Sequence, residues 1–243
     1  MLTMQSSNAR TMDARGFSAQ LPREGHLPPN NSPGAQPIAL DDRLSQGTVR
    51  RLECKEHVFC EGDPRMHVFR VEEGVIAVYK TLVDGRRQII DFAYPGDLIG
   101  LGMLREHVLS AQAVCKAKVR CLSAAALERA AEADANLAIK LYKAVCQELA
   151  ATRQLLVTVG QRSAVERLAS FLLTLHHRVG DNGRPTITLA MRRSDIADLL
   201  GLTIETVSRT LTKLRTMGVI DIEQGGTTVN LRDIHRLEEL ASG

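Results

Sequence analysis

The chain has 243 residues, of which 44% are hydrophobic and 24% are charged, proportions typical of a globular protein that buries a core. Its formal net charge of +3 is too small to indicate a nucleic-acid partner by itself. No apolar run reaches the ~18 residues that a membrane span needs, and the N-terminus lacks the apolar segment of a signal peptide. Together with five cysteines in no paired framework, these features predict a cytoplasmic protein of one or two domains.

Residues 1–40 have the composition of a flexible tail. Five of the eight prolines fall in this segment, among Asn, Ser and Gly, and large apolar side chains are few. Such a segment cannot bury enough apolar surface to fold alone. We therefore expect an unstructured extension, and the alternative of a partner-binding segment stays open.

Residues 41–125 are predicted to form a compact antiparallel β domain. Gly62, Gly74, Gly85 and Gly96 recur every 11 or 12 residues. Evenly spaced short strands with glycine turns are typical of an antiparallel sandwich or barrel, and no helical segment separates them as a parallel sheet requires. The strand-like runs lie at 67–71, 75–79 and 88–92.

Residues 126–160 are predicted to form one long helix that mediates dimerisation. Uncharged residues recur there at alternating spacings of four and three, which favours pairing with a second copy over packing within the same domain. This seam consists of Ala138, Tyr142, Val145, Leu149, Thr152, Leu156 and Val159. Gly160 is expected to interrupt the helix, and Ser163 with Glu166 forms the capping box of a new helix.

Residues 193–215 are predicted to form a helix-turn-helix. Gly201 separates two amphipathic stretches and can adopt the positive φ of a tight turn. Each stretch has one apolar face, and Ala197 is small enough to lie beneath a crossing helix. These faces comprise Ile196, Ala197, Leu199 and Leu200 in the first stretch, and Ile204, Val207, Leu211 and Leu214 in the second.

The second stretch also has a separate polar face that suits base edges in a major groove. Arg209 and Glu205 lie one turn apart on it; arginine donates to guanine O6 and N7, and glutamate accepts from cytosine N4. An ordinary helical hairpin with a solvated face is the alternative. The predicted DNA-contacting residues are Arg193, Thr203, Glu205, Thr206, Ser208, Arg209, Thr212 and Lys213.

A hairpin at 219–231 follows, with Gly225 and Gly226 between its strand-like runs, and a short helix is expected at 233–241. A strand pair directly after a recognition helix is typical of the wing of a winged helix. We therefore predict a winged helix-turn-helix domain over residues 161–243.

The order of β domain, long helix and winged helix resembles the CRP/FNR superfamily of bacterial transcription regulators over residues 44–240. The matching motifs lie within 61–100 and 161–209. The resemblance implies an α+β fold with an N-terminal antiparallel β jelly roll of the cyclic-nucleotide-binding type, a dimerisation helix and a C-terminal winged helix-turn-helix. It also implies a homodimer that binds double-stranded DNA and contacts RNA polymerase.

The E-x-x-S-R arrangement at 205–209 is similar to that of the FNR and FixK branch. The resemblance therefore implies a palindromic TTGA…TCAA target and an activator of low-oxygen or nitrogen-oxide genes. In this interpretation Glu205 and Arg209 read the G·C pair, and Ser208 contacts a neighbouring thymine. The turn that resembles the polymerase-contacting loop of the family consists of Asp84, Gly85 and Arg86.

The resemblance also sets expectations for ligands. The superfamily's cAMP site needs a carboxylate and an arginine, but the matching stretches 100–102 and 109–111 carry neither, so no cyclic nucleotide is expected. The FNR iron–sulfur cluster needs cysteines near the N-terminus, and none precedes Cys54. We therefore predict no cofactor and no metal.

The cysteines leave alternatives open. Cys54 and Cys60, like Cys115 and Cys121, are six residues apart, so each pair would face one side if it lay within a strand. Buried structural thiols are the favoured interpretation, and a redox- or metal-gated regulator is the alternative. Haem ligation and an enzyme on the β domain also stay open, although no catalytic motif is present. The histidines considered for haem are His57, His67 and His107.

Overall fold

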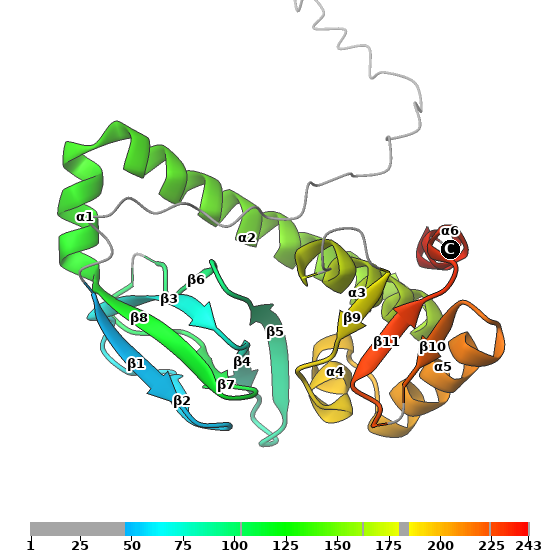
Figure 1. The fold of residues 1–243 in the computed structure, drawn as a ribbon. Helices are drawn as coiled ribbons and strands as arrows, with labels where there is room; N and C mark the ends of the chain where they lie inside the picture. The colour runs from blue at the N-terminus through cyan, green and yellow to red at the C-terminus, as the bar shows by residue number, and fades with distance from the viewer. Residues whose placement is uncertain (1–46, 103, 162, 180–184, 224, 243) are drawn as a thin grey trace, which may run out of the picture. The chain divides into compact units, whose positions relative to one another are not determined.

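The computed structural model describes residues 47–102, 104–161, 163–179, 185–223 and 225–242 (Figure 1). The predicted tail at 1–40 lies outside the described residues. Among the residues described, none of the helices combines the length and the apolarity that a bilayer crossing demands.

Two four-stranded antiparallel sheets form the N-terminal domain, and their strand orders are β1-β8-β3-β6 and β2-β7-β4-β5. The strands predicted at 67–71, 75–79 and 88–92 are confirmed as β3, β4 and β5. The strands are β1 (Thr48–Leu52), β2 (His57–Phe59), β3 (His67–Glu73), β4 (Ile76–Thr81), β5 (Arg87–Ala93), β6 (Leu98–Ile99), β7 (Ser110–Ala113) and β8 (Ala117–Ser123).

The core of this domain lies between the two sheets. Phe69 and Val71 alternate with outward-facing residues on β3, and they join Ile76 of the other sheet and Val119 of β8 in one buried apolar cluster. Successive side chains of a strand point to opposite faces, so every second residue contributes to this core.

The helical region that follows differs from the single helix predicted over 126–160. It consists of α1 (Ala124–Ala133) and α2 (Ala135–Gln161), which are separated at Asp134. The Asp134 backbone is extended, and its carboxylate accepts hydrogen bonds from the backbone N–H of Asn136 (2.9 Å) and Leu137 (3.4 Å). An aspartate that caps a helix start in this way favours a break over continuation. The long helix in Figure 1 is α2.

The predicted interruption at Gly160 is also wrong, because α2 continues through Gly160 to Gln161. A glycine inside a helix lowers its stability by about 1 kcal/mol without ending it. The capping box after it is confirmed. The Ser163 hydroxyl accepts from the Glu166 backbone N–H at 3.4 Å, and the Ser163 N–H donates to the Glu166 carboxylate at 3.3 Å.

The C-terminal region contains the predicted helix-turn-helix, wing hairpin and final helix, together with strand β9, which sequence patterns miss. β9 pairs with a strand far along the chain, Thr188 with Thr228, so no local spacing relates the two strands. Together with β10, these strands form a three-stranded sheet in which β11 lies between β10 and β9. The elements are α3 (Ala164–Val179), β9 (Thr186–Thr188), α4 (Arg193–Leu200), α5 (Ile204–Thr216), β10 (Ile220–Ile222), β11 (Thr228–Leu231) and α6 (Ile234–Ser242).

Candidate DNA-binding interface

The turn between α4 and α5 has the geometry that its sequence predicts. Gly201 ends α4 in the left-handed region, at φ 62° and ψ 42°. The Leu202 N–H donates to the Ala197 carbonyl oxygen at 3.0 Å, which closes the turn. Side chains other than glycine rarely adopt this backbone conformation. The positive φ predicted for Gly201 is therefore confirmed.

The apolar faces of both helices pack as predicted, with one exception. On α4 all four predicted apolar residues are buried, and on α5 Val207, Leu211 and Leu214 are buried. Ile204 was predicted to join them, but 49% of it is exposed. It occupies the first position of α5, ahead of the turns that pack on the core, and periodicity alone does not reveal this end effect.

The polar face of α5 is open to solvent. Glu205, Arg209 and Thr212 are exposed, and Ser208 is half-buried. Thr203 caps the helix, because its hydroxyl accepts from the Thr206 backbone N–H at 3.2 Å. Thr203 thus caps the helix that presents the predicted reading residues on one face.

Glu205 is held as an ionised acceptor. Its own backbone N–H and the Thr203 hydroxyl donate to its carboxylate, and Arg209 adds an opposite charge, so the pKa of Glu205 lies below its usual value. An ionised carboxylate can only accept hydrogen bonds. It therefore matches an amino donor such as cytosine N4 and disfavours a base edge that offers only acceptors.

Positive charge surrounds this face. Arg193, at the start of α4, donates from Nη1 to the Ser208 hydroxyl at 3.3 Å. Its other terminal nitrogen lies 3.6 Å from the position that a Cβ on Gly226, in the wing turn, would occupy. Arg193 thus lies between α5 and the turn of the β10–β11 hairpin, a placement that tertiary packing decides. The exposed cations of α4, its N-cap and α5 are Arg192, Arg193, Arg209, Lys213 and Arg215.

The predicted seam lies along α2 with most of its large apolar side chains exposed in the single chain. Exposure is 70% for Tyr142, 48% for Val145, 47% for Leu149 and 69% for Leu156. Its smaller members, together with Val159, are half-buried. Two further exposed apolar residues of α2, Ile139 and Val157, fall outside the four-three spacing and were not predicted.

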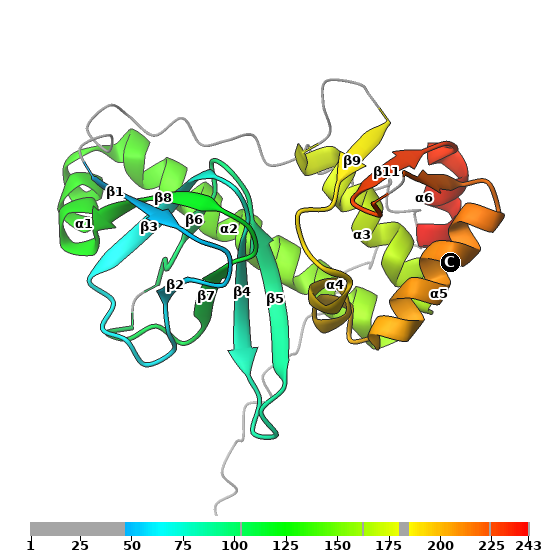
Figure 2. The ribbon, with the colours of Figure 1, turned by 60° about the horizontal axis from the view of Figure 1, so that its bottom comes forward.

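The turn at residues 84–86 forms the tip of the β4–β5 hairpin, which projects from its sheet in Figure 2. Gly85 adopts a φ of 80°. The Asp84 carboxylate accepts from the Arg86 backbone at 3.0 Å and from its guanidinium at 2.7 Å. Val83 beside them is fully exposed. The tip is therefore a pre-shaped surface loop.

The expectation of buried cysteines is wrong for Cys54 and Cys60, which are exposed, whereas Cys115 and Cys121 are half-buried. Neither pair shares a strand. Cys54 follows the end of β1, and Cys115 precedes the start of β8. Burial raises the pKa of the Cys121 thiol above its usual value, which makes it a poor nucleophile. Within the described ranges, no cluster of His, Cys, Asp or Glu has the arrangement of a metal site.

Two of the three histidines considered as haem ligands make other contacts, whereas His67 is exposed. His57 is hydrogen-bonded to the Tyr79 hydroxyl at 2.8 Å. His107 is buried, and its ring stacks on Phe59 with the ring centres 3.8 Å apart. A Cβ at Gly100 would come within 3.0 Å of the His107 ring. Gly100 also has a φ of 79°, so a side chain at this position would be strained.

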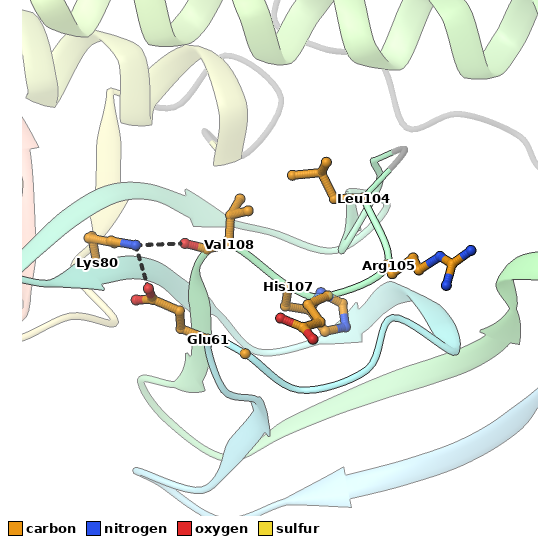
Figure 3. A pocket seen from close by; sticks show the side chains of 8 residues that line it. Glu61, Lys80, Leu104, Arg105, His107 and Val108 are labelled. Carbon is orange, nitrogen blue, oxygen red and sulfur yellow. Dashed lines mark hydrogen bonds and ion pairs between the residues drawn. The ribbon is translucent and has the colours of Figure 1, made fainter.

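A shallow pocket of about 380 Å³ opens beside this stretch, lined by residues 61, 62, 80 and 104–108. The Lys80 ammonium donates to the Glu61 carboxylate and to the Val108 carbonyl oxygen, while Arg105 is directed away from that pair (Figure 3). Lys80 already has a counter-ion here. The pocket mixes acidic and basic groups instead of concentrating the positive charge that a phosphate needs.

Comparison with known proteins agrees with this architecture. Residues 166–240 match a family model described as a Crp-like helix-turn-helix domain, and residues 49–134 match one described as a cyclic nucleotide-binding domain. The chain is similar to the nitrogen fixation regulation protein FixK of Bradyrhizobium diazoefficiens, with 42% identity over 189 residues that cover 77% of this chain and 79% of that protein.

Two further similarities point the same way. The transcriptional activator protein anr of Pseudomonas aeruginosa is 33% identical over 209 residues, which cover 84% of either chain. The solved structure of FixK2 from Bradyrhizobium japonicum superposes with a TM-score of 0.77 at 36% identity, covering 81% of this chain and 98% of that one. The relatives named here are regulators, not enzymes.

Proposed function

Because the chain belongs to the CRP/FNR family of transcription regulators, we propose that it acts in the cytoplasm as a homodimeric activator of the FixK type. Its target is a TTGA…TCAA palindrome, and the genes it controls serve low-oxygen or nitrogen-oxide metabolism. The name of the FixK relative refers to regulation of nitrogen fixation, and the name of anr refers to transcriptional activation, which supports the proposed role as an activator.

The observation that carries the proposal is the placement of exposed Glu205 and Arg209, with half-buried Ser208, on a helix whose opposite face is buried. Arg209 donates to guanine O6 and N7, the ionised Glu205 accepts from the paired cytosine, and Ser208 contacts a neighbouring thymine. Arg193, Thr212 and Lys213 contact the backbone or adjacent bases. Reading of this kind is sequence-specific because each base edge offers a different donor and acceptor pattern.

The dimer is proposed to form along α2. Its exposed apolar seam has the spacing of a two-stranded coiled coil, and a second copy would remove that surface from water. Two recognition helices related by a two-fold axis then face half-sites about one helical turn apart. The pre-shaped tip at 84–86 remains available for RNA polymerase. The chain is proposed to need no cofactor for DNA recognition.

Arg209→Ala is expected to weaken binding of the palindrome by about 1–3 kcal/mol and to relax the preference at the G·C pair. The reason is the loss of the bidentate contact to guanine. Fluorescence anisotropy at fixed salt, with the palindrome and with a duplex altered only at that pair, measures both effects. Arg129→Ala, at an exposed site on α1, serves as the matched control. Unchanged affinity and unchanged preference would refute the docking.

Addition of cAMP or cGMP is expected to produce no binding heat and no change in affinity for the palindrome. The stretches at 100–102 and 109–111 carry no charged side chain, and Lys80 nearby is paired with Glu61. Calorimetry with either nucleotide, followed by the DNA titration in its presence, makes the test. Saturable binding at micromolar concentration would contradict this prediction and would assign a different signal to the β domain.

A further inference from the structure

Arg167 joins the start of α3 to the turn of the helix-turn-helix. It is half-buried, and its Nη1 donates to the carbonyl oxygens of Leu200 at 2.8 Å and Gly201 at 3.4 Å. Leu200 is the last residue of α4, and Gly201 is its C-cap. The guanidinium therefore binds the end of one helix of the motif from outside the motif.

The chemistry at this point suits a cation. The last carbonyl groups of a helix have no partner within it, and the helix dipole places negative charge there. An arginine satisfies these acceptors with donors held in a rigid plane. The contact thus fixes the orientation of the Gly201 carbonyl as well as its charge environment.

The orientation of that carbonyl controls the direction in which α5 leaves the turn. Only Leu202 and Thr203 separate Gly201 from α5, and Thr203 is already its N-cap. Glu205 follows within the first turn of the helix. A change in the peptide after Gly201 therefore moves the reading residues directly.

The same turn is bounded on a second side by the end of α2. A Cβ added at Gly201 would lie 3.3 Å from Val159 Cγ1 and 3.5 Å from Arg167 Nη1. Val159 is the last residue of the seam. Arg167 and Val159 therefore hold the turn where the helix proposed for dimerisation meets the reading motif.

We propose that Arg167 is a positioning residue for DNA sequence recognition: it sets the direction of α5 so that Glu205 and Arg209 reach their base pair, without contacting DNA itself. This role rests on the proposed function, because it presupposes that α5 reads bases. It predicts a loss of specificity, not a uniform loss of affinity.

The test compares the unaltered protein with Arg167→Gln, Arg167→Lys and the control Arg129→Gln. The duplex is the site that the unaltered full-length protein selects from random DNA, and a scrambled duplex of equal length measures non-specific binding. Dissociation constants are determined for both duplexes across a range of salt concentrations. Thermal melting of each variant shows whether it is folded at the assay temperature.

Arg167→Gln is expected to lower the ratio of specific to non-specific affinity about tenfold, the order of one poorly formed base contact. Non-specific affinity and its salt dependence stay unchanged. Arg167→Lys, which keeps the charge but not the planar donors, is expected to lose about threefold. Should Arg167→Gln melt below the assay temperature, the result for Arg167→Lys decides.

Two results would overturn the inference. An equal loss on both duplexes, with a salt slope reduced by about one, would identify Arg167 as a phosphate contact. If the folded variants keep the unaltered protein's ratio of specific to non-specific affinity, the contact of Arg167 with the turn does not position α5. If the unaltered protein selects no sequence at all, the proposed function fails and this inference fails with it.

Discussion

Leu149→Asp is expected to convert the protein into a monomer and to weaken binding of the palindrome by at least about 100-fold, the order of the avidity that a linked second site provides. Leu149 lies in the middle of the seam, and 47% of it is exposed in the single chain. In the proposed dimer an aspartate there would be removed from water beside its copy on the partner helix. Desolvation and like-charge repulsion both oppose this.

Sedimentation equilibrium measures the association, and DNA titration of the same samples measures the affinity. Ala150→Asp is the matched control. Ala150 is exposed and lies next to Leu149 but outside the seam, so this substitution introduces the same charge without placing it in the seam. It should remain dimeric and retain its affinity. A dimeric Leu149→Asp protein would show that the seam is not the interface, whatever its affinity for DNA.

Leu214→Ala is expected to lower the free energy of unfolding by about 2–5 kcal/mol, the usual cost of emptying a buried leucine site. Leu214 is fully buried, and it belongs to the apolar cluster that also contains Leu168 and Leu172 of α3. The loss concerns the side of α5 that faces the core, opposite to the proposed reading face. We therefore expect substitutions on the buried face of α5 to change stability and substitutions on its exposed face to change DNA binding.

Urea denaturation followed by circular dichroism measures the change in stability. Lys213→Ala, at the adjacent exposed position, is the control. Its free energy of unfolding should stay within about 0.5 kcal/mol of the unaltered value, while its DNA affinity falls on all sequences alike. A loss of less than about 1 kcal/mol for Leu214→Ala would mean that the core closes around the missing side chain.

Much of the winged helix was predictable because its signals are local. The alternating apolar and polar faces of α5, the glycine of the turn and the capping box of α3 each depend on residues at most a few positions apart. Such spacing translates directly into one face of a helix or one turn. The strands of the β domain were predictable for the same reason, since glycine turns separate their apolar runs.

Other features were mispredicted because their signals are weak or depend on packing. Asp134 lies between two segments of equally helical composition, so the apolar spacing does not reveal that it caps a new helix. Ile204 continues the apolar spacing of α5 but lies at its first position. The exposure of Cys54 and Cys60 depends on how the connections on either side of β2 fold. The six-residue separation of the two cysteines does not indicate this.

The sequence by itself determined the face of α5 that we propose reads DNA, because the polar residues and the buried face of that helix follow from its own period. Only the tertiary structure decided what holds α5 in place. Arg193 and Ser208 are 15 residues apart, and Arg167 and Leu200 are 33 residues apart. No local pattern relates such pairs; they meet because the helices carrying them pack on one shared apolar core.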